Sequence, residues 1–441
     1  MLKIAPALIG LALFFVSTTT VRAAPPHVVK TTPENGAKDV SPNTKQIVVV
    51  FDQPMSRSGR SIVGGGDSFP ELGQITWSDP KTLVISVKLK PDHDYWLSIN
   101  SETFTNFRNA KNEPCVAYPI AFSTASPESA KLDPAMNKKS IDQLRKAIDN
   151  DYSYRDLRKV DWNKLFKDGT PKLEAAPTAS AFAEAAGERL APANDVHMWL
   201  KVGDRTIATT KRDVPANVNV RTLERLVPQW QRNKPGIIAT GEFDDGIMYL
   251  LIAGWQSDPK LYEDAFDVIE SLDANKGLII DVRANAGGDE SRARDLAGCF
   301  VKEPVVYSKH TIRKNGRWIG PQDRTLEPTK GRPSISASKV VVLQGRYCMS
   351  SNESFLLMMK SAGATLVGET TFGSSGNPQP HELDNGVTIY LPSWKDMLPD
   401  GSTLEGVGVK PQVEVKAQPK DFDDADPVLD AALSRLRGGA K

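Results

Sequence analysis

The spacing of hydrophobic positions changes along the chain, and each pattern predicts a different kind of domain. Residues 26–124 hold short runs rich in β-branched and aromatic residues, separated by turn-forming stretches such as Pro33–Gly36. These runs are Gln46–Phe51, Thr82–Leu89, Tyr95–Ile99 and Val116–Ser123. Short strands with regular turns are typical of a β-sandwich. The first pattern therefore predicts an all-β domain over residues 26–124.

A Ser-, Pro- and Ala-rich stretch near residues 123–134 has the composition of a linker, and beyond it the hydrophobic period becomes 3.6. Apolar residues then share one helical face at Ile141, Leu144 and Ile148. Asp161 is placed to cap a second helix, and a third helical stretch ends at Leu190. The second pattern predicts a small helical subdomain over residues 135–200.

From about residue 236, short buried runs alternate with helical spacing. The expected strands are Ile247–Ala253, Leu278–Val282, Val340–Leu343 and Thr365–Val367, and a further strand, Val387–Leu391, leads into the tail. Helices are expected between them, around residues 261–272, 291–300 and 353–361. This βαβ order implies a parallel sheet covered by helices on both faces. The third pattern predicts an α/β core over residues 201–420.

The longest apolar run, Ile4–Val16, stands near the start of the chain after Lys3. Thirteen residues are too few to cross about 30 Å of hydrocarbon as a helix, and Val21–Ala23 suits cleavage by a signal peptidase. We expect residues 1–23 to be a signal peptide, and the mature chain to be periplasmic or extracellular with no stable membrane span. An uncleaved N-terminal anchor is the alternative.

Composition narrows the classes of partner and cofactor. The chain of 441 residues has 55 Lys and Arg against 54 Asp and Glu, and this balance provides no positive field for nucleic acid. The cysteines at 115, 299 and 348 are too scattered for a disulfide framework or a zinc site. We expect no metal, nucleotide or organic cofactor, and Cys348 to be a small buried residue. The oligomeric state is not determined by the sequence.

A glycine pair follows one of the expected buried strands. The segment Gly277–Gly288 runs from that strand into Gly287 and Gly288, at the start of a helix. Glycines allow the backbone to approach a ligand, and free amides at a helix N-terminus favour negative charge, such as an oxyanion. A simple tight turn is the alternative interpretation.

A serine occupies the corresponding turn after another buried strand. Ser350 stands between the strand that starts at Val340 and the next helix, where its hydroxyl would be exposed beside the amide of Ser351. This arrangement supplies a nucleophile and an oxyanion donor together. Alternatively, Ser350 is only a helix cap, with Glu353 completing a capping box.

A serine nucleophile needs a base, and histidine has a free pKa near neutrality. His27 and His93 lie in the predicted sandwich, while His310 and His381 lie in polar surroundings that suggest loops. His197, directly after the helical segment, is therefore the leading candidate for the base.

Together these segments resemble the serine peptidase family that includes the carboxyl-terminal processing proteases, the tricorn core protease and the interphotoreceptor retinoid-binding protein. The resemblance covers residues 138–415, and its best-matched pieces are Gly277–Gly288, Met349–Phe355, Leu366–Gly373 and Glu405–Pro411. It implies a crotonase-like core. Separately, Thr31–Val40 and Ile47–Met55 resemble the bacterial Ig-like domains of secreted and surface proteins.

The resemblance implies that Ser350 is the nucleophile, and that the amides of Ser351 and of Gly287 or Gly288 form the oxyanion hole. In the carboxyl-terminal processing branch a lysine follows Phe-Gly and acts as the base. Here Phe372 and Gly373 are followed by Ser374 and Ser375, so this chain departs from the Ser-Lys pattern.

The tricorn-like branch instead places a histidine after the helical segment, at the position that His197 resembles. In that branch an acidic residue of the closing segment, which Glu405–Pro411 resembles here, completes the site. This makes Glu405 the candidate acid and Asp195 its substitute. Val196 stands where the tricorn protease has a serine.

The sequence thus predicts a secreted serine endopeptidase that acts on peptides or proteins through an acyl-enzyme. No glycine-rich carboxylate-binding loop typical of a PDZ module is seen, so specificity for protein C-termini is not assumed. The alternative is a noncatalytic member of the family that binds a peptide or an apolar ligand at the cell surface.

Overall fold

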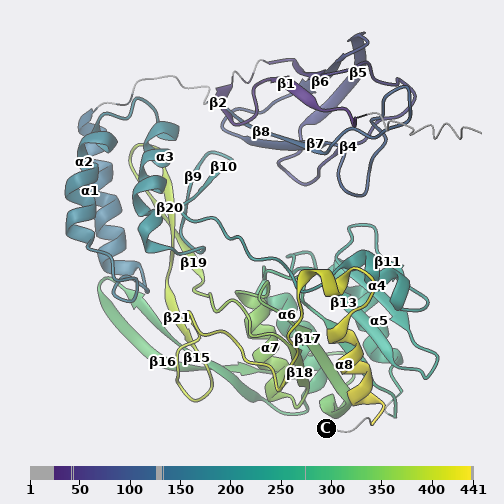
Figure 1. Ribbon diagram of the computed structural model, residues 1–441. Helices are drawn as coiled ribbons and strands as arrows, with labels where there is room; N and C mark the ends of the chain where they lie inside the picture. Colours follow the sequence, from purple (N-terminus) through teal and green to yellow (C-terminus); the bar gives the residue numbers. More distant parts are fainter. Residues whose placement is uncertain are drawn as a thin grey trace, which may run out of the picture. The chain divides into compact units, whose positions relative to one another are not determined.

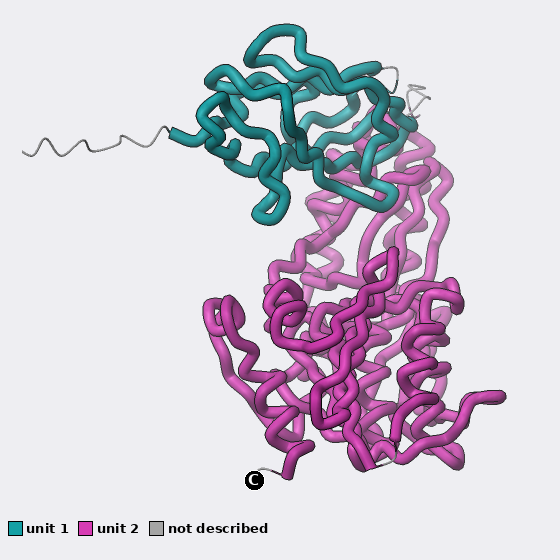
Figure 2. Tube along the Cα trace, turned by 90° about the vertical axis from the view of Figure 1, so that its right-hand side faces the viewer, with its two compact units in different colours: residues 1–129 teal, residues 130–441 magenta. Residues whose placement is uncertain are grey.

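A computed structural model describes residues 24–40, 42, 44–125, 132, 134–273 and 275–438. The signal peptide expected over residues 1–23 lies outside the described residues. The chain divides into two compact units, Met1–Ser129 and Ala130–Lys441 (Figure 2). Within the described residues, no helix combines the length and the apolar character needed to cross a membrane.

The first unit is a sandwich of two four-stranded sheets. One sheet has the order β1 (Val28–Thr32), β3 (Gln46–Phe51), β6 (Thr82–Lys88), β5 (Glu71–Asp79). The other has the order β2 (Ala37–Val40), β8 (Tyr118–Thr124), β7 (Asp94–Ile99), β4 (Ile62–Val63). Alternate residues of these strands, among them Ile47, Leu83 and Leu97, are fully buried in one apolar core. All four strands predicted for this region are present.

The second unit begins with a helical part that packs on a small sheet. Its helices are α1 (Pro134–Asp151), α2 (Trp162–Glu174) and α3 (Ala179–Leu190), and Asp161 caps α2 by accepting the amide of Lys164 at 3.0 Å. The sheet has the order β10 (Arg205–Ala208), β9 (Trp199–Val202), β20 (Thr388–Pro392), β19 (Pro378–Glu382).

Three strands of this small sheet, β10, β19 and β20, come from the range 201–420 that the sequence assigned to the α/β core. Leu383, Val387, Ile389 and Leu391 lie in the same apolar cluster as the helices α1 to α3. The core of the helical part is therefore completed by β20 and the turn that precedes it, a segment about 200 residues further along the chain.

The rest of the second unit is built on a seven-stranded sheet (Figure 1). The strand order is β11 (Gln231–Arg232), β12 (Ile238–Glu242), β13 (Met248–Ile252), β14 (Leu278–Asp281), β17 (Val340–Gln344), β18 (Thr365–Gly368), β22 (Val413–Glu414). Neighbours from β13 to β22 are parallel, as predicted, whereas β11 and β12 pair antiparallel at one edge.

Helices cover both faces of this sheet. The helices α5 (Glu263–Ser271), α6 (Glu290–Ala297) and α7 (Ser351–Ser361) share an apolar cluster with one face. The helices α4 (Val220–Leu226) and α8 (Pro427–Leu436) share a second cluster with the other face. Short 3₁₀ turns lie at Ala191–Ala193, Pro259–Tyr262, Gly298–Phe300, Ala337–Lys339 and Pro419–Phe422. The expected two-sided burial of the sheet is confirmed.

The sequence missed a long hairpin formed by β15 (Val305–Lys314) and β16 (Arg317–Leu326), which pairs with β21 (Trp394–Met397). His310 lies within β15 and His381 within β19, so their assignment to loops was wrong. Most positions of β15 are half-buried and most of β16 are exposed, and both strands carry charged residues, so the alternation that would predict strands is hidden.

Candidate active site

The turn between β17 and α7 holds Ser350 in a strained conformation. Its φ is +59° and its ψ is −136°, a region that costs a non-glycine residue about 1–3 kcal/mol. This strain recurs at serine nucleophiles on sharp strand-to-helix turns, where it exposes the hydroxyl. Ser350 also occupies the N-cap position of α7, and its amide donates to Oε2 of Glu353 at 3.2 Å.

The glycine loop after β14 lies against this turn, because β14 and β17 are adjacent parallel strands whose carboxyl ends meet. A Cβ built on Gly287 would lie 2.8 Å from Cβ of Ser350, so only glycine allows this approach. Ser351 fixes the loop from the other side, since its hydroxyl donates to the Gly288 carbonyl at 2.7 Å.

The backbone amides of this region differ in whether they are already occupied. The amide of Gly287 donates to Oδ1 of Asn285 at 2.8 Å. In the described part of the chain, the amides of Gly288 and Ser351 donate to no protein acceptor. Two unoccupied amides next to a strained serine can bind the oxygen of a tetrahedral intermediate.

Glu353 joins the serine turn to the loop that follows β18. One of its oxygens accepts the amides of Ser350 and Ser374, at 3.2 and 2.9 Å, and the other accepts the amide of Gly373 at 2.8 Å and the hydroxyl of Thr371. Burial raises the pKa of this carboxyl to about 8. Glu353 therefore does more than cap a helix, because it fixes two loops of the site to each other.

The imidazole of His197 approaches the same loop. Its Nδ1 lies 2.9 Å from Oγ of Ser374, whose carbonyl accepts the amide of Ser350 at 2.8 Å. His197 and Ser350 are thus brought together on Ser374, although among the described residues the ring makes no hydrogen bond to the Ser350 hydroxyl. Burial lowers the pKa of His197, so the ring is neutral at neutral pH, as a general base must be.

The two candidate acids lie near the histidine but do not contact its ring. Oδ1 of Asp195 accepts the backbone amide of His197 at 2.9 Å. Oε2 of Glu405 accepts the amide of Ser375 at 3.1 Å. Burial raises the pKa of Glu405 to about 7. Both carboxylates therefore hold the backbone on either side of the imidazole rather than the imidazole itself.

Sequence reasoning missed Ser374, the residue that contacts the imidazole. It stands directly after Phe372 and Gly373, where the carboxyl-terminal processing branch has its lysine, and this position was the available signal. Cys348, in contrast, is fully buried as expected. Burial raises the pKa of its thiol to about 12, which keeps it protonated and poorly nucleophilic.

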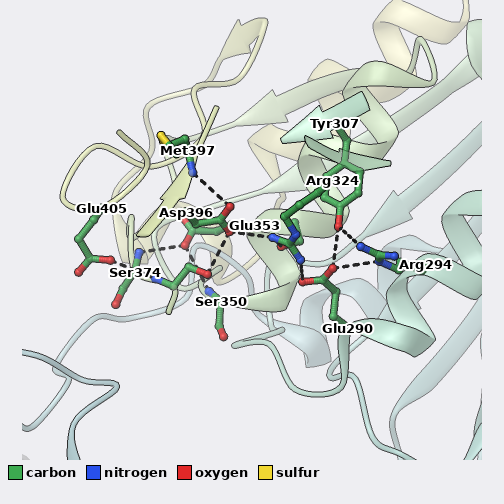
Figure 3. Close-up of polar contacts among 12 residues, drawn as sticks. Glu290, Arg294, Tyr307, Arg324, Ser350, Glu353, Ser374, Asp396, Met397 and Glu405 are labelled. Atoms are coloured by element: carbon green, nitrogen blue, oxygen red, sulfur yellow. Dashed lines mark hydrogen bonds and ion pairs between the residues drawn. The ribbon is translucent and has the colours of Figure 1, made fainter. Parts of the chain in front are cut away.

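Buried ion pairs support the loops of the site. Arg283, in the glycine loop, is fully buried and pairs with Asp281 at 2.7 Å and with Asp426 at 2.8 Å. A second buried arginine, Arg324, pairs with Glu290 and, at 3.1 Å, with Asp396 (Figure 3). Within the described residues, no group of three or more His, Cys, Asp or Glu side chains is arranged to hold a metal ion.

Comparison with known proteins finds two families that segments of this chain match. The model of peptidase family S41 matches residues 246–415, and that of the bacterial Ig-like domain matches residues 22–124. The carboxy-terminal processing protease CtpA of Bacillus subtilis is 27% identical over 176 residues, which are 40% of this chain and 35% of that protein. The tricorn protease of Thermoplasma acidophilum is 28% identical over 166 residues, 36% of this chain and 14% of that protein. The chain thus spans about a third or less of these relatives' length.

A solved structure shows that the fold is shared. The crystal structure of a candidate peptidase from Parabacteroides merdae superposes with a TM-score of 0.57 at 21% identity, over 68% of this chain and 96% of that one. The resemblances to both families drawn from the sequence are confirmed. This chain therefore carries a bacterial Ig-like domain followed by a domain of peptidase family S41.

Proposed function

We propose that this protein is an exported serine endopeptidase that cleaves peptide bonds through an acyl-enzyme at Ser350. The observation that carries the proposal is the strained turn at Ser350, with φ of +59°, beside the unoccupied amides of Ser351 and Gly288. A turn of this kind presents the hydroxyl and the oxyanion donors on the same side. The S41 match supports a peptidase, and the crotonase-like description of its core belongs to the same proposal.

In the proposed reaction the Ser350 oxygen attacks the scissile carbonyl carbon, while His197 takes the hydroxyl proton and later gives it to the leaving amine. The contact between Ser374 and Nδ1 orients the ring and leaves Nε2 for this proton. Catalytic hydrogen bonds are often long without substrate, so substrate binding is expected to bring Nε2 to the Ser350 hydroxyl.

For the oxyanion hole we propose the amides of Ser351 and Gly288. Gly287 is less suited as a donor, because its amide is held by Asn285. Loss of one such donor commonly costs about 2.7–4 kcal/mol of transition-state stabilisation. Asp195 and Glu405 then support catalysis by holding the loops of His197 and Ser374.

A fluorophosphonate probe tests the proposal directly. The wild-type chain should be labelled and should hydrolyse an unstructured protein substrate. Ser350→Ala should abolish labelling and reduce turnover by roughly four to six orders of magnitude, as for other serine nucleophiles. Ser338→Ala, at an exposed serine, is the matched control and should behave as wild type.

Turnover that survives Ser350→Ala would refute the assignment of the nucleophile. If the wild type is not labelled and yet binds peptides or apolar ligands tightly, the chain is a noncatalytic member of the family. Labelling that disappears only in Ser350→Ala supports the enzyme.

A further inference from the structure

Arg158 is a buried cation near the site that the proposed reaction does not yet use. It lies in the loop between α1 and α2, 39 residues before His197 in the chain, and its side chain is only 16% exposed. Its guanidinium lies over the ring of Tyr154, at 5.2 Å from the ring centroid, and its Nε donates to the Tyr152 hydroxyl at 3.2 Å. Packing and hydrogen bonds thus fix its direction.

One nitrogen of this guanidinium contacts both candidate acids of the site. Nη2 of Arg158 lies 2.9 Å from Oδ2 of Asp195, and the same nitrogen donates to Oε1 of Glu405. Tyr152 completes the cluster by donating its hydroxyl to Oδ2 of Asp195 at 2.6 Å. The two carboxylates come from segments 210 residues apart in the chain, and Arg158 is the cation between them.

The remaining oxygens of these carboxylates hold the two segments that flank the imidazole. Asp195 holds the His197 amide through Oδ1, and Glu405 holds the Ser375 amide through Oε2. Ser375 directly follows Ser374, whose hydroxyl contacts the His197 ring. A displacement of either carboxylate would therefore move the ring or its partner.

The negative charges of Asp195 and Glu405 explain why a cation such as Arg158 is needed between them. The side chains of Asp195 and Glu405 are 1% and 3% exposed, and two buried carboxylates at this separation repel each other unless a cation lies between them. The charged groups that act on the His197 ring are Asp195, which raises its pKa, and Arg158 and Arg212, which lower it. Glu405 and Glu353 hold the adjoining loop by accepting the amides of Ser375 and Ser374.

We propose that Arg158 is a positioning residue of the active site, which clamps Asp195 and Glu405 and thereby holds the loop of His197 and the loop of Ser374 in register. The helical part of the second unit thus contributes a positioning side chain, Arg158, to the site as well as structural support. This inference rests on the proposed serine peptidase function.

Two substitutions separate charge from geometry. Arg158→Met removes the charge and keeps most of the apolar stem. Arg158→Lys keeps the charge, but an ammonium group lacks the planar fork that reaches both carboxylates and the Tyr152 hydroxyl. The matched control is Arg155→Met in the same loop, because Arg155 pairs with the partly exposed Asp149 and the exposed Asp156 instead of with the candidate acids.

Turnover measured against pH is the main readout. In Arg158→Met we expect kcat to fall by roughly 10- to 100-fold, the scale of a misplacement of about 1 Å. KM should change little, because the guanidinium is already occupied by Asp195, Glu405 and Tyr152. The acid limb of the kcat/KM profile should move to higher pH, since a nearby cation that lowers the pKa of His197 is lost. Arg158→Lys should lose rate but keep the wild-type acid limb, and Arg155→Met should match wild type.

The proposal is overturned if Arg158→Met keeps the wild-type rate and acid limb, or if Arg155→Met shows the same loss. If the wild type shows no turnover that depends on Ser350, the peptidase assignment has failed and the clamp is judged separately. In that case the His197 ring is titrated by NMR in chains labelled at histidine. A higher titration midpoint in Arg158→Met supports the clamp, and an unchanged midpoint overturns it.

Discussion

Gly287→Ala tests whether the approach of the glycine loop to the serine turn is as tight as the structure shows. The added Cβ would lie 2.8 Å from Cβ of Ser350 and 3.0 Å from the Met349 carbonyl oxygen. Non-bonded carbons pack at about 3.5–4.0 Å, so the serine turn must retreat by roughly 0.7 Å or more. The φ of +107° adds a backbone cost of about 1–3 kcal/mol for a residue with a side chain.

The expected result is a loss of both stability and activity. Backbone strain and crowding together predict a destabilisation of about 2–6 kcal/mol. A retreat of nearly 1 Å by the nucleophile predicts a fall in kcat/KM of about 100-fold. Urea unfolding measures the first effect, and fluorophosphonate labelling rates together with peptide hydrolysis measure the second.

Gly386→Ala is the control for backbone strain without crowding. Gly386 has a φ of +83° in the turn between β19 and β20, and a Cβ there would meet nothing within 4 Å. This variant should lose some stability but keep wild-type labelling. If Gly287→Ala also labels at the wild-type rate, the reasoning about the contact between Gly287 and Ser350 is wrong.

Three further substitutions probe the buried polar groups of the second unit. In Glu353→Gln the amide nitrogen cannot accept backbone N–H groups, so at least one of the three amides at Glu353 loses its acceptor, and urea unfolding should show a loss of about 1–3 kcal/mol. An unchanged urea midpoint would contradict the loss of an acceptor for these amides. The pKa of Glu405 is raised from 4.5 to about 7 in the folded chain, so its contribution to stability is complete below pH 4.5 and is lost as the pH rises through about 7. The melting temperature of Glu405→Gln should therefore fall less between pH 4.5 and about 7 than that of the wild type. Melting temperatures that fall in parallel would count against burial as the cause of the raised pKa. Asp426→Asn leaves Arg283 with one carboxylate where it had two, and should cost about 3–5 kcal/mol in thermal or urea denaturation, whereas a wild-type melting temperature would refute a structural role for this pair.

The sequence by itself determined those local elements whose apolar residues follow a clear period. Four strands of the sandwich, β3, β6, β7 and β8, and the parallel strands β13, β14, β17 and β18 were predicted, because period and β-branched residues are local signals. The glycine loop and the turn at Ser350 were found for the same reason, since each consists of consecutive residues after a buried strand. The residues proposed for the nucleophile and the oxyanion hole are of this local kind.

The tertiary structure alone decided which distant side chains meet. The contact between His197 and Ser374 joins positions 177 apart, and that between Arg158 and Glu405 joins positions 247 apart. The polar side chains of the site follow no periodic pattern in the sequence. Their partners depend on how the helical part packs against β20 and against the closing segment. For this reason the sequence pointed to Glu405 and Asp195 as partners of the imidazole, whereas in the folded chain both hold backbone amides and Ser374 holds the ring.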